Sequence, residues 1–526
     1  MPLELRIPDE RAAPPKDLEI RPKQVRAWLA SLPLAQTFDS AKRLAVHLTA
    51  LNRALMDTDE RVEVLEIYRP VALVLLEELE DLYARSVQPL TPRAREALDH
   101  ARTLASGISA GYKIAILEKS AKRIAFGVKK QLPFLMLRAM QYLVAEMRAS
   151  YKAYSPVPAG IWKEIHSLYL HAEREGLAVE AADPESKACI AELYCESLLL
   201  ALTDPYRLVP GDVDRIVAQI RSLRAPVTLQ QRRPESRPGA HFLVPCDTDK
   251  PPKPALSASD ETGGPNWRLL DANPIVERLR ARKQAMDAGN VSATMSKMMS
   301  ADDLALTGRL ALLWGDPPRR GQRRDPADMS VAICVGLKAI GHFVSLDAQM
   351  DAEAQQDALR RGITMPVARL AADDPALSIP IFEWNVVNQS VGGLKVKRSG
   401  PSVQVIGVGD VIGVKIPGKP AWMAAVARWI TTLDDGGLEF GLQFLAPAAC
   451  PVWIQPAAAA APQAKLGLLL VDEADESGGE LLLTPPSTYS DLREFELKGE
   501  DMLSRVRAGA LIESTARFEL FHVLPS

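Results

Sequence analysis

The hydrophobic pattern of this chain changes once along its length, and that change divides it into two kinds of structure. From about residue 20 to residue 225, apolar residues recur at the three- and four-residue spacing of amphipathic helices. After residue 329, short alternating apolar runs are separated by turns rich in Gly, Asn and Asp, a pattern typical of antiparallel strands. The sequence therefore predicts a multidomain α+β protein with a helical half followed by a β-rich half.

We expect residues 1–225 to form an all-α interaction domain. Residues 226–268 have the proline-rich composition of a linker, with one short strand candidate at 241–246. Residues 269–314 are predicted to form connecting helices. Within the all-α domain, caps and first-turn prolines predict helices at 22–32, 40–55, 59–85, 91–130, 133–153, 159–175, 184–202 and 211–224.

Composition excludes several classes of protein. A net charge of −3 over 526 residues argues against a general nucleic-acid coat. The N-terminus has no apolar signal segment, and no apolar run approaches about 20 residues, so neither a signal peptide nor a membrane span is expected. The five cysteines are scattered without a Cys-x-x-Cys pair, which indicates reduced thiols in a cytoplasmic protein.

Nothing in the sequence predicts an enzyme, a metal or a cofactor. No Gly-rich phosphate loop, zinc signature or Ser/His/Asp order is present. His166 and His171 lie five positions apart on a predicted helix, about 140° around its axis, so one metal ion cannot easily bind both. A basic cluster is interpreted as a solvated face or a contact for an acidic partner; it comprises Lys119, Lys122, Arg123, Lys129, Lys130 and Arg138.

The segment Asn388-Gln-Ser-Val-Gly-Gly393 lies between two strand-like runs. In an extended backbone, residues i and i+2 point to the same face, so Asn388 and Ser390 can hold one ligand together. Gly392 and Gly393 permit a positive φ or a close backbone approach. A plain turn made of ordinary turn residues is the alternative interpretation.

An arginine-rich segment precedes the first predicted strand and contains Arg-x-x-x-Arg twice, as Arg319/Arg323 and Arg320/Arg324. An arginine fork can meet guanine N7 and O6 with two hydrogen bonds, and arginine also stacks on purines and neutralises phosphate. We expect this arm to be disordered without a ligand, because four arginines with nearby Pro and Gly cannot bury themselves. A solvated linker or a nonspecific nucleic-acid contact is the alternative.

These two motifs are followed by strand-like runs at 409–416, 423–430 and 438–444, the last carrying Gly441 and Phe444. This order resembles the PilZ domain, the bacterial receptor for cyclic di-GMP, over residues 315–450. The resemblance implies a small antiparallel β-barrel that holds the dinucleotide between its arginine arm and the Asn/Ser turn. It assigns the ligand to Arg319, Arg320, Arg323, Arg324, Asn388, Ser390 and Gly393.

The interval between the two motifs is longer than the family usually has, since 63 residues separate Arg324 from Asn388. We expect an insertion at about 345–378, preceded by a strand pair over 329–343 and containing a short helix at 351–361. The Arg320/Arg324 pair is the preferred match, with Arg319/Arg323 as close neighbours. Residues 451–464 are predicted to be a linker and 465–526 a small C-terminal β-domain to which no ligand is assigned.

The leading hypothesis is a non-enzymatic cyclic di-GMP receptor that couples nucleotide binding to an unidentified protein partner of the helical domain. A role in motility, pili or exopolysaccharide would follow from the resemblance alone. The alternative is a scaffold whose PilZ-like barrel binds no nucleotide. A protein that binds RNA or DNA through the basic arm is a more distant alternative, and no nucleic acid is expected.

Overall fold

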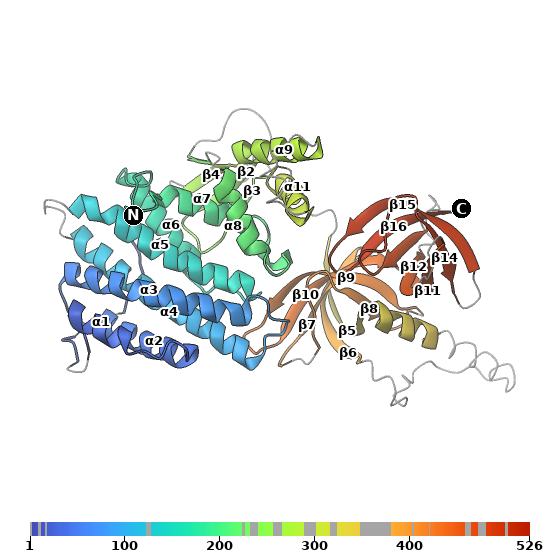
Figure 1. The fold of residues 1–526 in the computed structure, drawn as a ribbon, viewed down its shortest axis with the longest axis horizontal. Coiled ribbons are helices and arrows are strands. Elements are labelled where there is room, and N and C mark those ends of the chain that lie inside the picture. The colour runs from blue at the N-terminus through green and yellow to red at the C-terminus, as the bar shows by residue number, and fades with distance from the viewer. Residues whose placement is uncertain are drawn as a thin grey trace. The chain divides into compact units, whose positions relative to one another are not determined.

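The chain forms two compact units, one made of residues 1–86 and 90–319 and the other of residues 87–89 and 320–526 (Figure 1). The structure is a computed structural model. It describes residues 3–8, 12–15, 18–121, 128–223, 227–231, 240–255, 266–288, 301–315, 323–347, 380–401, 404–419, 421–457, 464–471, 480–499 and 503–525.

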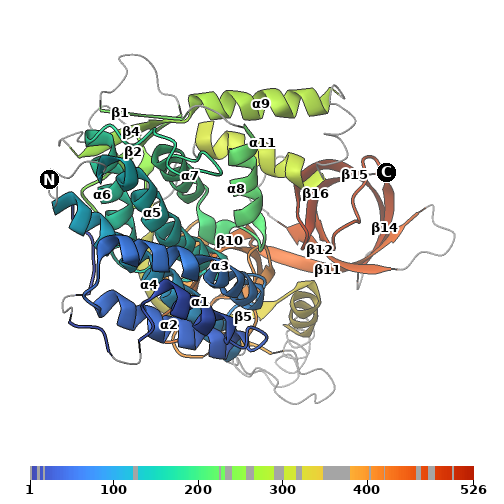
Figure 2. The same cartoon turned by 60° about the vertical axis from the view of Figure 1, so that its left-hand side comes forward.

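The first unit begins with a bundle of helices around one apolar core. Figure 2 shows α1 and α2 beside α3 and α4, and these helices are in contact. Helices α2, α3 and α4 contribute the fully buried Leu48, Tyr68 and Tyr112 to the core. The bounds are α1 (Pro22–Ala30), α2 (Thr37–Arg53), α3 (Thr58–Tyr83), α4 (Pro92–Ala121), α5 (Val128–Lys152), α6 (Ile161–Arg174), α7 (Ile190–Ala201) and α8 (Asp212–Leu223).

A capping side chain explains where α3 begins, and two other helices begin at residues that differ from the prediction. Asp57 accepts hydrogen bonds from the Asp59 and Glu60 amides and so begins α3. The predicted start of α5 at Pro133 was wrong, because α5 begins at Val128 and holds this proline in its second turn. The predicted start of α7 at 184 was also wrong. Asp183 accepts from two following amides and forms a turn there, and the helix begins only at Ile190.

Part of the stretch that was predicted to be a linker is a four-stranded antiparallel sheet in the first unit. Its order is β1-β4-β2-β3, so the two longest strands lie at its centre. Phe242 and Leu270 face each other across these central strands and are almost fully buried. The strands are β1 (Thr228–Gln230), β2 (His241–Pro245), β3 (Lys253–Pro254) and β4 (Trp267–Asp271).

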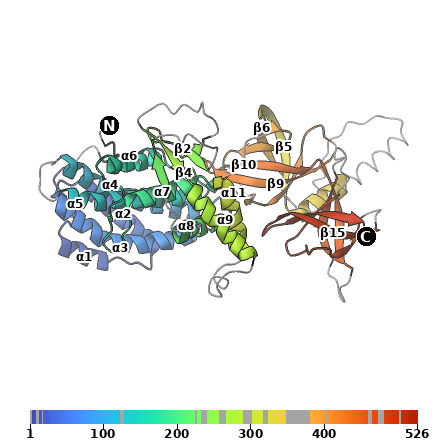
Figure 3. The same ribbon diagram turned by 90° about the horizontal axis from the view of Figure 1, so that it is seen from above.

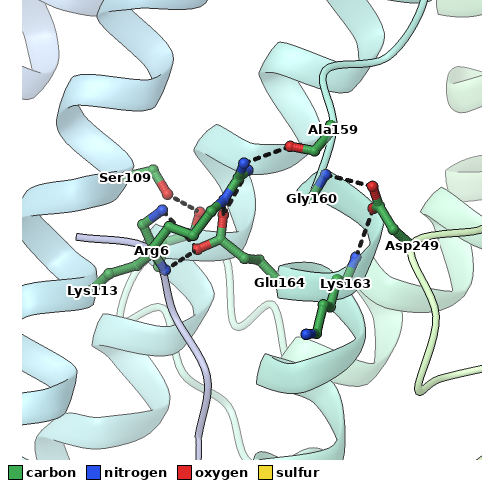
Figure 4. Close-up of polar contacts among 9 residues, drawn as sticks. Arg6, Ser109, Lys113, Ala159, Gly160, Lys163, Glu164 and Asp249 are labelled. Atoms are coloured by element: carbon green, nitrogen blue, oxygen red, sulfur yellow. Dashed lines mark hydrogen bonds and ion pairs between the residues drawn. The ribbon is translucent and has the colours of Figure 1, made fainter. Parts of the chain in front are cut away.

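The loop between β2 and β3 fastens this sheet to α6. Asp249 accepts hydrogen bonds from the backbone amides of Gly160 and Lys163, at the N-terminus of α6 (Figure 4). His166 is fully buried and lies within hydrogen-bond distance of the Lys250 carbonyl and the Tyr194 hydroxyl. Burial lowers the pKa of His166 to about 4, so this imidazole is neutral near pH 7.

Asp249→Ala is expected to destabilise the first unit by about 1 kcal/mol, because two amides at the N-terminus of α6 lose their acceptor. Urea unfolding followed by far-ultraviolet circular dichroism measures the change. The matched control is Asp247→Ala, which removes an exposed carboxylate from the same loop. Equal unfolding midpoints for the two variants would contradict a capping role for Asp249.

A buried carboxylate holds the N-terminal segment on the bundle. Glu164 of α6 accepts the Lys113 ammonium at 2.9 Å and the Arg6 backbone amide at 2.6 Å (Figure 4). The Glu164 and Lys113 side chains are only 4% and 5% exposed. The Arg6 guanidinium adds bonds to the same carboxylate and to the Ala159 carbonyl. One acid therefore connects three segments that are distant in sequence.

Two further helices, α9 (Asn273–Asp287) and α11 (Ala301–Gly315), pack side by side in the first unit (Figure 2). Trp314 is fully buried, and its indole N–H donates to the Leu199 carbonyl of α7 at 3.1 Å. Arg215 of α8 bonds Asp303 of α11. The predicted connecting helices are therefore integral to the first unit.

The basic cluster predicted for α4 and α5 is not a solvated face where the structure describes its side chains. Lys119 is buried and pairs with Asp59 at 2.7 Å. Arg138 is buried and pairs with Asp183 at 3.0 Å. Burial of the aliphatic stems and pairing of the charges explain both positions. Lys122, Arg123, Lys129 and Lys130 lie outside the residues whose side chains are described.

The second unit begins with the predicted antiparallel barrel, of which Figure 3 labels β5, β6, β9 and β10. The barrel closes in the order β10-β7-β6-β5-β8-β9. Trp384 and Phe440 meet edge to face in its interior, with ring centroids 4.8 Å apart. The strands are β5 (Asp325–Val335), β6 (Phe382–Ser390), β7 (Gly393–Arg398), β8 (Val411–Lys415), β9 (Met423–Thr432) and β10 (Leu438–Ala446).

The C-terminal β-domain is a second closed barrel, with the order β11-β12-β13-β16-β15-β14. Phe495 and Phe521 are fully buried in its core. Its strands are β11 (Ala448–Pro456), β12 (Lys465–Val471), β13 (Leu481–Thr484), β14 (Glu494–Lys498), β15 (Leu503–Ser514) and β16 (Glu519–Pro525). Residues 451–456, which were predicted to begin a linker, therefore lie in β11.

The two barrels share an apolar cluster, which explains another incorrect prediction. Residues 337–347 are helical and not the second strand of a pair. Gly336, with φ of +95°, ends β5 and turns the chain. The helix buries Ile340 and Phe343 in a cluster that also contains Leu468 and Phe518 of the second barrel. The predicted helix at 351–361 lies outside the described residues.

None of the helices in the described ranges combines the length and apolarity that crossing a bilayer requires.

Candidate functional site

The Asn388–Gly393 motif forms the hairpin between β6 and β7. Ser390 pairs with Gly393, leaving Val391 and Gly392 as a two-residue loop. A register shift follows Val386, after which Asn388 pairs with Lys395. Because the pairing is regular from there to the loop, Asn388 and Ser390 lie on the same face of the sheet.

Gly393 has a structural reason for being glycine. A Cβ atom at this position would lie 2.0 Å from the Leu442 carbonyl oxygen of β10. Neither Gly392 nor Gly393 has a positive φ, so close approach and not unusual backbone geometry explains Gly393. Any contact of Gly393 with a ligand would come in addition to this packing role.

The arginine arm and the Asn/Ser turn meet at the start of β5. Asp325 pairs with Gln389 and Pro326 with Asn388, so Arg324 and Ser390 are the next positions outward. An open pocket of about 450 Å³ lies at this end of the barrel. Its lining is Arg323, Asp325, Gln389, Ser390 and Val391.

The arginines of the arm are only partly described. The Arg323 guanidinium is 91% exposed and lies 3.2 Å from the Asp325 carboxylate, which is itself 63% exposed. An exposed pair of this kind is weak, so an anionic ligand can replace Asp325 as the partner of Arg323. Arg319 and Arg320 lie outside the described residues.

A row of side chains extends the site across the outer face of the sheet. Register pairs Asn388 with Lys395, Lys395 with Gly441, and Gly441 with Trp429. The indole lies over Gly441, since a Cβ there would be 2.0 Å from Trp429 Nε1. Lys395 Nζ lies 5.8 Å from the centre of the Trp429 ring and 2.9 Å from Glu439.

Sequence reasoning missed Lys395 and Trp429. They occupy positions in β7 and β9 that lie outside every short motif, and only the cross-strand register places them in one row with Asn388. The one usable signal was Gly441 within a predicted strand, because a strand glycine often marks a place where another group approaches closely.

One polar atom at this face has no hydrogen-bond partner among the described residues. This atom is Asn388 Oδ1, and it is buried. A buried acceptor without a partner costs free energy that a donor on a ligand can recover. The described residues contain no group of three or more His, Cys, Asp and Glu side chains arranged to hold a metal ion.

Comparison with known protein families covers most of the chain. Residues 23–235 match the N-terminal domain of the cyclic-di-GMP receptor FimW. Residues 241–358 and 349–451 match its middle PilZ domain. The chain belongs to the FimW family. The match to the FimW middle domain begins at the start of β2, so it includes most of the four-stranded sheet, α9 and α11 as well as the first barrel.

A relative of the chain is the cyclic-di-GMP receptor FimW of Pseudomonas aeruginosa. It is 25% identical over 509 residues, which cover 86% of this chain and 82% of the relative. No solved structure matches the chain. The family models end at residue 451, so nearly all of the second barrel lies beyond both matched FimW domains.

Proposed function

We propose that this protein is a receptor for cyclic di-GMP and that the ligand binds at the hairpin end and outer face of the first barrel. The observation that carries the proposal is the pocket that brings Arg323 of the arm against Ser390 of the turn. Membership of the FimW family supports the same ligand.

The side chains around this pocket match the chemistry of the dinucleotide. Arginines of the arm, Arg319, Arg320, Arg323 and Arg324, offer planar forks to guanine edges and positive charge to the two phosphates. Asn388 Oδ1 is buried without a partner among the described residues, and it has the chemistry to accept from a guanine amino group. The Trp429 indole offers a flat apolar surface on which a guanine can stack.

We further propose that the protein acts by binding and not by catalysis, and that nucleotide binding changes how the helical domain meets a protein partner. Pili, motility or exopolysaccharide are the processes that the sequence resemblance suggests. Titration calorimetry of the full chain with cyclic di-GMP tests the receptor function, with GTP and a single-stranded oligonucleotide as controls. No heat with cyclic di-GMP favours the scaffold alternative, and equal binding of the oligonucleotide favours nucleic-acid binding.

Asn388→Ala is expected to weaken cyclic di-GMP binding about tenfold and to leave stability unchanged. One buried hydrogen bond to the ligand is lost, worth about 1–3 kcal/mol, whereas no bond within the described protein is broken. Ser390→Ala is expected to act in the same direction. Calorimetric titration measures the affinity, and thermal unfolding checks the fold.

The matched control for this change is Asn385→Ala, because Asn385 is an exposed asparagine earlier in β6. It bonds Ser330 and not the residues of the pocket. If Asn388→Ala and Ser390→Ala both keep the parent's affinity, the turn is not part of the site.

A further inference from the structure

Arg428 is one of the residues that connect the two barrels, and it lies next to Trp429 of the candidate site. Arg428 in β9 donates from both terminal nitrogens to the Glu513 carboxylate of β15, at 2.5 and 2.7 Å. Its Nε donates to Gln443 of β10 at 2.8 Å. We call the Arg428–Glu513 ion pair the inter-barrel clamp.

The backbone places Arg428 where it can act on Trp429. In the pairing of β9 with β10, Gly441 faces Trp429 but Leu442 faces Ala427, so Arg428 is the extra residue of a β-bulge. A bulge bends its strand and redirects the neighbouring side chains. The position of the Trp429 indole over Gly441 therefore depends on the geometry of this bulge.

Both ends of the clamp are held at irregular positions. The pairing of β15 with β16 shifts register twice, between Ala508 and Leu511 and again between Leu511 and Glu513. The bidentate geometry fixes the orientation of the guanidinium more tightly than a single contact would. The two side chains are 26% and 28% exposed, which reduces solvent screening of the pair.

Arg428 also reaches the other half of the candidate site. Its partner Gln443 pairs with Gly393, the glycine that closes the Asn/Ser hairpin. The Gly392 carbonyl accepts from the amide of the next residue, Phe444. One side chain thus touches β10 beside the hairpin, flanks the tryptophan, and is held by the second barrel.

We propose that the inter-barrel clamp is a positioning device for the cyclic dinucleotide site, through which the C-terminal barrel sets the stacking surface of Trp429. This inference rests on the proposed function. It gives the second barrel a role in ligand binding although none of the residues described in that barrel lines the pocket. By linkage, a nucleotide that stacks on Trp429 also changes the stability of the contact between the barrels.

The test is calorimetric titration of cyclic di-GMP into the full chain and its variants. Glu513→Ala and Glu513→Gln are both expected to weaken binding about tenfold, although Glu513 is not part of the pocket. The charge-exchanged variant, Arg428→Glu with Glu513→Arg, is expected to recover affinity to within about threefold of the parent, because the pair is restored in reverse.

Two controls separate positioning from general destabilisation. Lys415→Ala breaks the ion pair between Lys415 and Asp347, whose two side chains are 27% and 30% exposed, respectively. Lys415 lies in the same unit as the clamp, but on β8. This variant is expected to leave the affinity unchanged. In a Trp429→Ala background, Glu513→Ala is expected to cause no further loss, because the group that the clamp positions is gone.

Parent-like affinity of both Glu513 variants overturns the clamp and leaves the receptor function intact. If Glu513→Ala lowers the affinity equally in the parent and in the Trp429→Ala background, the clamp does not act by positioning the indole. Failure of the parent itself to bind cyclic di-GMP overturns the receptor function and the clamp together.

Discussion

Arg323→Lys with Arg324→Lys is expected to weaken cyclic di-GMP binding about 100-fold while the fold is unchanged. An ammonium group keeps the charge but lacks the planar fork that meets N7 and O6 of guanine together. Each lost bidentate contact is worth about 1–3 kcal/mol, and every 1.4 kcal/mol is about tenfold in affinity. The double variant removes one arginine from each of the two Arg-x-x-x-Arg pairs, so the prediction does not depend on the register of the arm.

Calorimetric titration at two salt concentrations checks this expectation. If the arm contributes charge alone, the lysine variant binds nearly as well as the parent, and both lose affinity steeply as salt rises. That outcome would remove guanine recognition from the arm. The control is Arg505→Lys with Arg507→Lys, which changes two exposed arginines of β15 in the second barrel.

The two arginine pairs can then be separated. Arg320→Lys with Arg324→Lys and Arg319→Lys with Arg323→Lys each change one pair. Sequence spacing favours the first pair as the ligand contact, whereas the lining of the pocket contains Arg323. The larger loss of affinity identifies the pair that meets the ligand.

Glu164→Leu is expected to destabilise the first unit by about 3–5 kcal/mol. The change leaves the Lys113 ammonium buried without its partner, and an uncompensated buried charge is among the most costly defects in a protein. The Arg6 backbone amide loses its acceptor as well, so the N-terminal segment is released from the bundle. Urea unfolding followed by far-ultraviolet circular dichroism measures the loss.

The double variant Glu164→Leu with Lys113→Met is expected to recover most of that stability, because two apolar side chains replace the pair in a well-packed position. Glu63→Leu is the control, since Glu63 and Arg26 form an exposed pair 3.8 Å apart whose loss costs about 1 kcal/mol or less. A loss at Glu164 as small as that at Glu63 would show that the buried pair contributes little.

Much of the fold was predictable because the determining signals are local. Helical spacing with caps and first-turn prolines predicted the helices of the bundle. Alternation with turn residues predicted most strands of the first barrel and a β-domain after it, although β11 was predicted in part to be a linker. The order of the arginine arm, the Asn388 turn and the Gly441 strand was sufficient to recognise the PilZ domain, which the family comparison confirmed.

The errors arose where tertiary packing overrides a local pattern. Proline-rich composition suggested a linker between the two halves, but buried contacts such as that of Phe242 with Leu270 make a sheet there. Residues 337–343 were predicted to lie in the second strand of a pair, but residues 337–347 form a helix because Ile340 and Phe343 fill the space between the barrels. The basic cluster looked solvated until Lys119 and Arg138 were seen paired and buried.

The sequence by itself determined the class of each half, the family, and the residues of the arm and turn, since each of these depends on neighbours within a few positions. Only the tertiary structure placed Lys395 beside Asn388, extended that row across the sheet to Trp429, and joined Arg428 to Glu513. Those contacts link strands whose register is set by barrel closure and by bulges, and closure is a property of all the strands together. No local pattern encodes it.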